Sequence, residues 1–224
     1  MELKTYRSLA ENVTVKAGEE QFNIARIKKI DLLFEELIKQ SPDDINVADE
    51  RMPYWADLWP SAIGMVQFLE ANRELVRGKQ VLEIGCGLGL PGIAAARFGA
   101  DVLMTDYLQP ALDFAQYNWE LNSKADFNGQ LLDWRKIDHM QPYDVVLASD
   151  VAYESRSFDT LINVIKKLTR PGGVFLLSEP NRKFASPFVT LVKQHFSVSS
   201  TDLPVELDGI AYTISIYQII VSAH

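Results

Sequence analysis

The sequence has very little cysteine, since Cys86 is the only one among 224 residues. One cysteine excludes an internal disulfide, which agrees with a reducing compartment. Long hydrophobic runs are also missing, because no segment approaches the roughly 20 apolar residues of a membrane-spanning helix. The N-terminal segment MELKTYRSLAENVTVKAGEE is polar and has no apolar signal-peptide core. We therefore expect a cytoplasmic protein that does not associate with a membrane.

Basic residues are scarce as well, with 22 Lys and Arg against 30 Asp and Glu and a net charge of -8. This sign repels a phosphate backbone unless a local basic patch overrides it. The densest basic segments, residues 26–29 and 182–183, are too short to form such a patch. The three histidines are scattered and lack metal-ligand spacing. Neither a nucleic-acid partner nor a metal site is expected.

The hydrophobic content of 47% is ordinary for a packed core, and the length favours one α/β domain with a small N-terminal extension. Residues 1–52 are expected to form that extension, a strand pair in VTVKAG and QFNIARI followed by an amphipathic helix around 31–39. Residues 53–224 are expected to form the main domain. From residue 80 onward short apolar strands alternate with helical stretches, which predicts a doubly wound, mostly parallel sheet with helices on both faces.

The expected elements of the main domain follow from this alternation. Ser61 is expected to begin a helix, and the last two strands should join at a turn around Asp208-Gly209. Because that hairpin breaks the rhythm, the last strand should insert antiparallel into a seven-stranded sheet. Strands are expected at 80–85, 101–106, 128–133, 143–149, 173–178, 196–207 and 211–221, with helices near 90–98, 109–122, 157–169 and 186–194.

Closely spaced glycines follow the first of these strands, in QVLEIGCGLGLPG. Such glycines let the backbone approach a ligand and direct free N–H groups at it. The pattern is not the dinucleotide G-x-G-x-x-G, because the third position after Gly87 is Leu90, and the Gly-Lys-Ser/Thr ending of a P-loop is absent. The alternative is a tight strand-to-helix turn without a ligand. We interpret Gly85-Cys86-Gly87-Leu88-Gly89 as a cofactor loop.

Two carboxylates accompany this loop. Glu83 stands two positions before Gly85, where it suits the ammonium group of an amino-acid-bearing cofactor and is unfavourable beside a pyrophosphate. Asp106 ends the next strand, 23 residues after Glu83, and could accept hydrogen bonds from two ribose hydroxyls. It could also simply cap the following helix.

Together these residues resemble the motifs of the class I, seven-stranded S-adenosylmethionine-dependent methyltransferases, over about residues 55–221. Three further segments, LWPSA at 58–62, LLDW at 131–134 and SDVAY at 149–153, resemble methyltransferase family 16. That family contains lysine methyltransferases of chaperones and metabolic enzymes, with nicotinamide-methylase-like bacterial relatives. The resemblance implies a Rossmann-like fold, S-adenosylmethionine as cofactor and N-methylation of a protein lysine or another amine.

The resemblance also implies which residues bind the cofactor. Trp59 would contact it from above, Asp133 and Trp134 would lie beside the adenine, and Ser149 would form part of the wall. Either tryptophan could instead be a core aromatic, and Trp55 is interpreted as structural. The implied cofactor-binding set is Trp59, Glu83, Gly85, Cys86, Gly87, Leu88, Gly89, Asp106, Tyr107, Asp133, Trp134 and Ser149.

Asp150 and Tyr153 match the family's D-x-x-Y signature and are the implied catalytic residues at the acceptor pocket. Methyl transfer from a sulfonium requires an acceptor lone pair in line with the leaving sulfur, so positioning can supply much of the acceleration. A lysine has a free pKa of about 10.4 and must lose a proton first. Asp150 would orient the amine, and Tyr153 would form an aromatic wall. Asp150 could instead cap a helix, and Tyr153 could cover the sheet edge.

Other functions remain open at this point. The chain could be a small-molecule methyltransferase in which residues 1–52 form a lid rather than a docking surface, or a cofactor-binding module without catalysis. A nucleic-acid methyltransferase is disfavoured, because SDVAY lacks the prolines of the Asn/Asp-Pro-Pro-aromatic motif found there in amino-methylating nucleic-acid enzymes. The identity of the methyl acceptor and the oligomeric state are not indicated by the sequence.

Overall fold

A computed structural model describes residues 3–39, 41, 47, 52–152, 155–181 and 185–222. Its main feature is a seven-stranded sheet with the strand order β5-β4-β3-β6-β7-β9-β8. All neighbouring strands are parallel except β9, which is antiparallel to both β7 and β8. The strands are β3 (Gln80–Ile84), β4 (Asp101–Asp106), β5 (Gly129–Leu131), β6 (Tyr143–Ser149), β7 (Thr169–Glu179), β8 (Ser197–Leu207) and β9 (Ile210–Ile220). The predicted fold class and the antiparallel last strand are confirmed.

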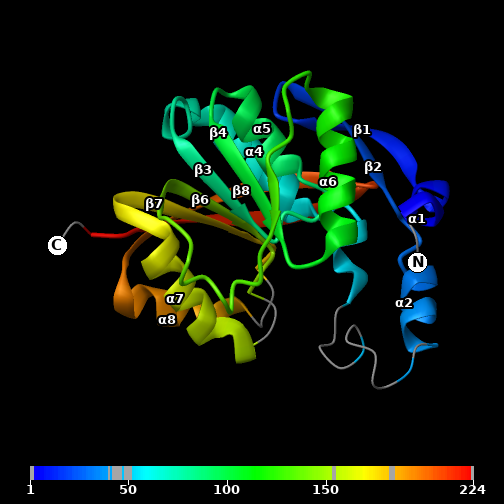
Figure 1. Ribbon diagram of the computed structural model, residues 1–224. Coiled ribbons are helices and arrows are strands. Elements are labelled where there is room, and N and C mark those ends of the chain that lie inside the picture. Colours follow the sequence, from blue (N-terminus) through cyan, green and yellow to red (C-terminus); the bar gives the residue numbers. More distant parts are fainter. Residues whose placement is uncertain are drawn as a thin grey trace.

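Helices cover both faces of this sheet (Figure 1). On one face lie α4 (Pro60–Ala71), α5 (Leu90–Arg97) and α6 (Gln109–Asn122), and on the other lie α7 (Phe158–Leu168) and α8 (Ala185–His195). Each of α4, α5 and α6 has a proline in its first turn. Proline fits there because its fixed φ is helical and the missing N–H would have no partner inside the helix.

The sheet separates two hydrophobic cores, and β6 shows how a strand serves both. Val145 and Leu147 belong to the core under α4–α6, whereas Val146 and Ala148 belong to the core under α7 and α8. Successive side chains of a strand point to opposite faces, so a strand buried on both sides must be apolar throughout. The continuous apolar runs of the sequence therefore form the central strands.

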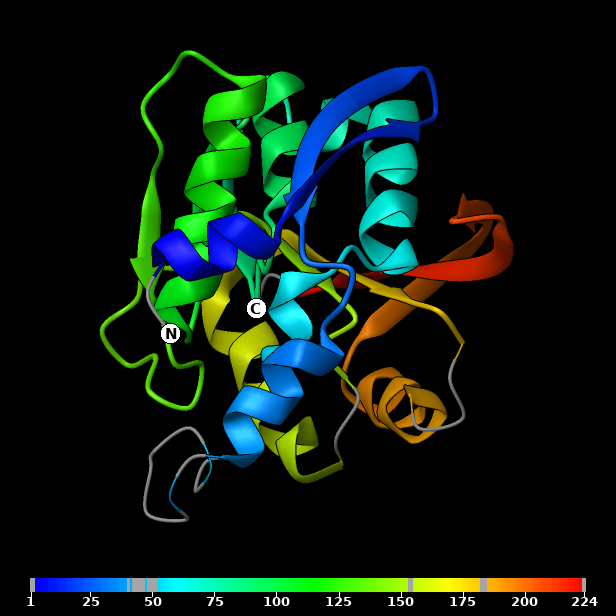
Figure 2. The ribbon, with the colours of Figure 1, turned by 90° about the vertical axis from the view of Figure 1, so that its right-hand side faces the viewer.

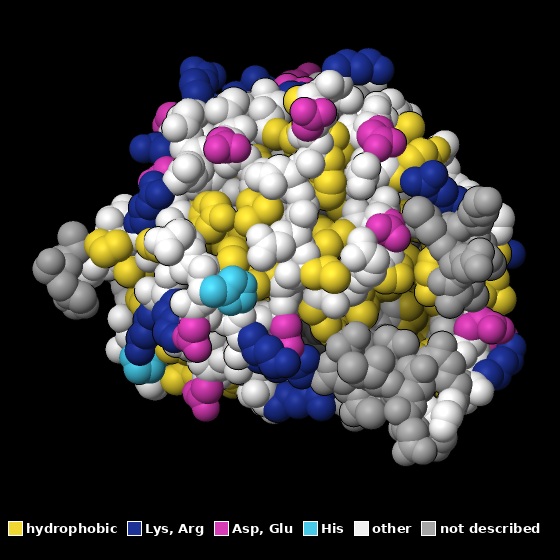
Figure 3. Space-filling view, viewed as in Figure 1, with side chains coloured by type: hydrophobic (Ala, Val, Ile, Leu, Met, Phe, Trp, Pro, Cys, Tyr) yellow, Lys and Arg dark blue, Asp and Glu magenta, His cyan; other side chains and the backbone are white. Residues whose placement is uncertain are grey.

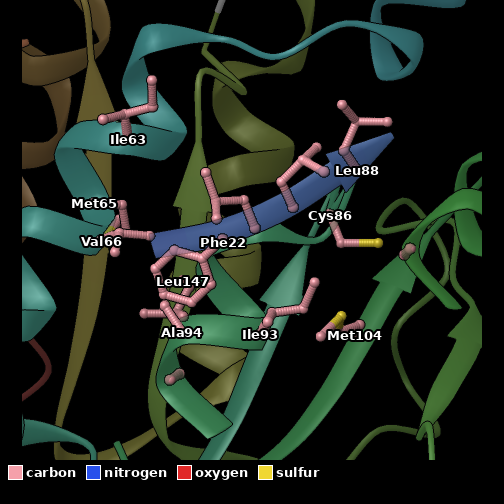
Figure 4. Close-up of a cluster of buried hydrophobic side chains, with 14 of the residues drawn as sticks. Phe22, Ile63, Met65, Val66, Cys86, Leu88, Ile93, Ala94, Met104 and Leu147 are labelled. Carbon is pink, nitrogen blue, oxygen red and sulfur yellow. The ribbon is translucent and has the colours of Figure 1, made fainter. Parts of the chain in front are cut away.

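The N-terminal segment forms α1 (Leu3–Leu9), the antiparallel pair β1 (Glu11–Ala17) and β2 (Glu20–Arg26), and α2 (Asp31–Ile38). The hairpin lies over the helices on one face of the main sheet (Figure 2). Phe22 of β2 is fully buried in one cluster with Val66, Ala94 and Leu147 (Figure 4). The hairpin is thus a separate sheet that shares the main core, and the division of the chain at residues 52 and 53 stays a prediction.

Several elements differ from the sequence-based expectation: β5 is shorter than the strand expected at 128–133, the short helices η1 (Pro53–Ala56), η2 (Arg73–Leu75) and η3 (Ser155–Ser157) were not expected, and two differences are larger. The helix α1 was not predicted, and β7 begins at Thr169 rather than at 173. The early start was missed because the segment Pro171-Gly172-Gly173 reads as a turn. In the structure Thr169 already pairs with Tyr143, and the register shifts between Tyr143 and Val145, which lets the strand absorb this segment as an irregularity.

Charged side chains on the face viewed in Figure 3 are mixed in sign, with basic and acidic groups interspersed around the edge of the molecule. None of the helices in the described ranges has the length and apolar content needed to cross a membrane.

Candidate functional site

A cavity of about 690 Å³ opens at the carboxyl ends of β3, β4 and β6. Ligands of open α/β sheets bind at this edge, where the loops after the strands diverge. Its walls come from the loop after β3, the ends of β4 and β6, the start of α7 and the segment of η1 (Pro53–Ala56) that leads into α4. The cavity is lined by the predicted residues Trp59, Glu83, Gly85, Cys86, Gly87, Leu88, Gly89, Asp106, Tyr107, Asp133, Trp134, Ser149 and Asp150. The structure therefore brings the predicted set together, apart from Tyr153, which lies outside the described residues.

The glycine loop has a backbone that side chains would disturb. Gly85, Gly87 and Gly89 have φ values of 60°, 51° and 79°, in the left-handed region that favours glycine. A Cβ on Gly87 would also lie 3.4 Å from the carbonyl oxygen of Trp55. The Cys86 N–H donates to the Thr105 carbonyl at 2.9 Å, which fastens the loop to the end of β4.

Asp106 is only 5% exposed and organises the floor of the cavity. Its Oδ2 accepts the Gly87 N–H at 3.1 Å, and its Oδ1 accepts the Leu108 N–H at 3.0 Å, just before α6. Burial raises the pKa of this carboxyl to about 6, against the lowering effect of these backbone donors. Because a carboxylate oxygen has more than one acceptor site, Asp106 can hold both loops and still accept ribose hydroxyls.

Glu83 is buried even more deeply, with 2% of its surface exposed. Its Oε2 accepts the Gly92 N–H at 3.1 Å, in the first turn of α5. A Cβ on Gly92 would lie 2.5 Å from that same oxygen, so any larger residue would force Glu83 to move. Burial, reinforced by the charge of Asp106, raises the pKa of Glu83 to about 8. An adjacent cation would favour the ionised form of this carboxyl.

The aromatic walls have distinct surroundings. The Trp134 ring lies 3.8 Å from where a Cβ on Gly85 would be, so it covers the start of the glycine loop. Trp59 donates from Nε1 to the Tyr54 carbonyl at 2.7 Å. Trp55 packs edge to face against Tyr6 and Phe114 at ring-centroid distances of 5.4 and 5.3 Å, and it also lines the cavity, so its interpretation as purely structural stays a prediction.

Asp133 is engaged locally. Its Oδ1 accepts hydrogen bonds from the Arg135 backbone N–H at 3.0 Å and from Arg135 Nε at 2.7 Å. These bonds lower the pKa of Asp133 against the opposing effect of partial burial. Its role beside the adenine stays a prediction.

The far wall is formed by the end of β6. Asp150 has a φ of 56°, a conformation that aspartate tolerates better than most residues, and its N–H donates to the Ser178 carbonyl at 2.9 Å. Ser149 Oγ accepts a hydrogen bond from Ser178 Oγ at 3.0 Å. The next residue, Val151, lies 3.4 Å from where a Cβ on Gly85 would be, so the wall touches the glycine loop.

Other residues of the site were not singled out in the sequence. Gly92 donates to Glu83 from the first turn of α5, and the Pro-Gly pair in GLGLPG could have indicated this close packing of the helix. Arg156, Ser157 and Thr160 line the cavity from η3 (Ser155–Ser157) and α7, where the sequence carries no recognisable motif.

The charges of the lining fit S-adenosylmethionine. Among the described residues, five carboxylates line the cavity, Asp57, Glu83, Asp106, Asp133 and Asp150, against two cations, Arg135 and Arg156. An acidic lining favours a ligand with an ammonium and a sulfonium over a pyrophosphate. When bound, S-adenosylmethionine supplies an electrophilic methyl group.

The sequence of the chain matches, over residues 41–210, a family model whose description is lysine methyltransferase. The chain belongs to this family. It is therefore a methyltransferase, and its methyl donor is S-adenosylmethionine, as the sequence predicted.

Three curated relatives of this family member show how far the similarity extends. Protein N-lysine methyltransferase METTL21A of Danio rerio is 33% identical over 66% of this chain and 72% of its own length. EEF1A lysine methyltransferase 3 of Mus musculus is 33% identical over 65% of this chain and 66% of its own length. Histone-arginine methyltransferase METTL23 of Homo sapiens is 34% identical over 48% of this chain and 60% of its own length. The chain thus spans about two thirds of the length of these relatives.

Solved structures share the fold at low sequence identity. The T. thermophilus 16S rRNA methyltransferase RsmC, in complex with AdoMet and guanosine, aligns with a TM-score of 0.62 at 16% identity over 95% of this chain and 51% of that chain. Magnesium protoporphyrin IX methyltransferase of Synechocystis with bound SAM aligns with a TM-score of 0.57 at 17% identity over 86% of this chain and 92% of that chain. Their different acceptors leave the substrate of this family member to be argued from its own site.

Proposed function

We propose that this methyltransferase transfers the methyl group of S-adenosylmethionine to the side-chain amine of a lysine in a protein. The observation that carries the proposal is the position of Asp150, which lines the cavity at the end of β6 next to Val151 and Gly85. A carboxylate at this place can accept a hydrogen bond from an amine and attract it while it is still charged. The family description and two of the three relatives above support lysine as the acceptor.

Each predicted cofactor residue has a role in this proposal. Glu83 faces the ammonium group, Asp106 accepts the ribose hydroxyls, and Trp134 lies beside the adenine. The glycines of the loop have positive φ values and no side chains, so the backbone can approach the cofactor closely. Trp59 and Tyr107 close the remaining sides of the cofactor site.

The acceptor amine must lose a proton before it attacks. A lysine with a free pKa of about 10.4 is mostly charged at neutral pH. Desolvation by the aromatic groups of the cavity disfavours the charged form, against the opposing effect of the Asp150 charge, and the amine releases its proton to water. Asp150 then orients the neutral amine toward the methyl group. In the same proposal, Tyr153 forms part of the acceptor pocket.

The N-terminal hairpin is proposed to be a docking element rather than a lid. Phe22 and Ile24 are fully buried in the shared core, so opening the hairpin would expose a large apolar surface. Arg26, at the end of β2, lies 3.8 Å from Asp57 in the cavity wall, so a fixed hairpin can instead present a surface to a protein substrate. We also propose that the protein acts in the cytoplasm, which the single cysteine supports.

Labelling with tritiated S-adenosylmethionine tests the proposed acceptor. The purified protein is incubated with an extract of the cells that make it, and the labelled protein fraction is hydrolysed to amino acids. We expect label in methylated lysine. The variant that tests Asp150 is Asp150→Asn, because asparagine also tolerates a positive φ and removes only the charge. It should reduce transfer by about a hundredfold, the usual scale for one positioned catalytic group, while S-adenosylhomocysteine still binds.

An arginine acceptor is the second candidate, favoured by the relative named as a histone-arginine methyltransferase. A guanidinium would also be attracted by Asp150, but it keeps its charge far above neutral pH. The same hydrolysis distinguishes the two acceptors, because label in methylated arginine would identify arginine, and not lysine, as the residue that is methylated. Label found only in small metabolites would favour the small-molecule alternative, and binding without any transfer would favour the non-catalytic one.

A further inference from the structure

Glu179 is a carboxylate at the end of β7 that the sequence left without a role. It is 1% exposed, although ionisable groups are rarely buried so deeply. Its Oε1 accepts the Ala152 N–H at 3.3 Å, from the segment that follows β6. Burial of a carboxylate is costly, so the hydrogen bond of Glu179 with the Ala152 N–H calls for an explanation.

The segment Asp150-Val151-Ala152 is fixed at both ends by β7. At one end the Asp150 N–H donates to the Ser178 carbonyl at 2.9 Å, and at the other the Ala152 N–H donates to Glu179. Between them the Val151 side chain packs next to Gly85. Asp150 has a positive φ, which persists in a non-glycine residue only when the surroundings hold it.

We propose that Glu179 is a positioning residue, whose side-chain oxygen anchors the Ala152 N–H and thereby fixes the direction in which Asp150 enters the cavity. Glu179 is not among the residues that line the cavity, so it acts through the segment rather than on the acceptor. This inference rests on the proposed function, because it takes Asp150 to bind the acceptor amine.

Two substitutions separate anchoring from charge. Glu179→Gln keeps a side-chain oxygen at the same distance along the chain and removes the charge, whereas Glu179→Ala removes the oxygen as well. Thr169→Val is the matched control. Thr169 is as deeply buried as Glu179 but lies at the opposite end of β7, away from the end that contacts Ala152.

Amide hydrogen exchange of the full chain reads the anchor directly, without any acceptor. We expect the Ala152 amide to exchange about tenfold faster in Glu179→Ala, the effect of losing one buried hydrogen bond, and at about the wild-type rate in Glu179→Gln and Thr169→Val. Extract labelling should fall by about tenfold in Glu179→Ala and should be largely retained in Glu179→Gln, with the Kd for S-adenosylhomocysteine about unchanged in both.

Unchanged exchange at Ala152 in Glu179→Ala would overturn the proposal. If Glu179→Ala does not fold, Glu179→Gln still decides. In Glu179→Gln, rapid exchange of the Ala152 amide would contradict the proposal, because the side-chain oxygen would then not anchor it. Loss of labelling with slow exchange of that amide would also contradict it, because the charge of Glu179 and not the anchor would then control transfer. If the wild-type enzyme transfers no label to any protein of the extract, the proposed function is rejected. The exchange rate of the Ala152 amide would still test whether Glu179 anchors it.

Discussion

At the scale of single residues, Asp106 makes the strongest case for the cofactor site. It lines the cavity and accepts the N–H groups of Gly87 and Leu108. We expect Asp106→Ala to raise the Kd for S-adenosylhomocysteine by at least about tenfold, the effect of losing charge-assisted hydrogen bonds, as measured by calorimetry. Glu120→Ala, at an exposed position of α6, is the control and should bind normally. Equal affinity in both variants would reject the assignment of Asp106.

Gly92 gives a prediction for stability. A Cβ there would lie 2.5 Å from Glu83 Oε2 and 2.8 Å from the Met104 methyl group. We expect Gly92→Ala to lower the free energy of unfolding by about 1–3 kcal/mol, the usual cost of overpacking, in urea denaturation. At Gly78 nothing lies within 4 Å of an added Cβ, so Gly78→Ala should cost only the strain of its positive φ. A smaller loss at Gly92 than at Gly78 would show that Glu83 and Met104 can move aside.

Residues of the site were predictable where a motif requires a particular chemistry. Closely spaced glycines and a carboxylate at a strand end are recognisable as sequence patterns, which is why Gly85 and Asp106 could be predicted. Gly92 left only the weak signal of a Pro-Gly pair, and Glu179 left none, because its role depends on the backbone N–H that lies opposite it in space. Only the pairing of β6 with β7 brings Glu179 to Ala152.

At the scale of elements, Arg26 joins the hairpin to two distant segments. It is 3% exposed and binds both carboxylate oxygens of Asp208 at 2.9 and 3.0 Å, in the turn between β8 and β9. Its Nε donates to Glu11 at 3.0 Å, and its Nη1 lies 3.8 Å from Asp57 in the cavity wall. The pKa of Asp208 falls to about 2, chiefly because of the hydrogen bond from Arg26.

We therefore expect Arg26→Ala to lower the free energy of unfolding by about 2 kcal/mol in urea. The estimate is modest for a buried arginine because Glu11 and Asp208 are partly exposed, and water can hydrate them when the guanidinium is removed. Arg73→Ala, which removes a much more exposed arginine from its pairs with Glu20 and Glu70, should cost less than about 1 kcal/mol. Similar losses in the two variants would contradict a special role for Arg26.

The elements themselves were largely predictable, because alternating apolar strands and helices determine a doubly wound sheet. The strands β4 and β6 have the predicted bounds. The start of β7 was not predictable, because a Pro-Gly-Gly segment has turn propensity. In the structure this segment lies between the pairs Tyr143–Thr169 and Val145–Val174 and exchanges backbone hydrogen bonds with Val221. The ion pairs of Arg26 also lay beyond the sequence, because 182 residues separate it from Asp208.

At the scale of the whole molecule, the acidic cavity couples stability to pH. The pKa of Glu83 is raised to about 8 and that of Asp106 to about 6, so both bind protons more tightly in the folded chain than in the unfolded chain. A raised carboxyl pKa contributes stability that is present below the unfolded value and is lost as the pH rises through the folded value. The protein without cofactor should therefore become less stable from about pH 4 to about pH 8.

Thermal unfolding at pH 5 and pH 8 measures this loss, and Glu83→Gln isolates the share of Glu83. The Tm of the wild type should fall between these values, and the Tm of Glu83→Gln should fall less, because glutamine does not titrate. The lowered pKa values of Asp133, Asp144 and Asp208 act only at acidic pH and leave this interval free of their effect. S-adenosylmethionine should reverse the trend in the wild type, since its ammonium favours the ionised Glu83, and calorimetry in buffers of different ionisation enthalpy should detect a released proton. A difference in Tm between wild type and Glu83→Gln that is the same at both pH values would mean that Glu83 does not titrate in this interval.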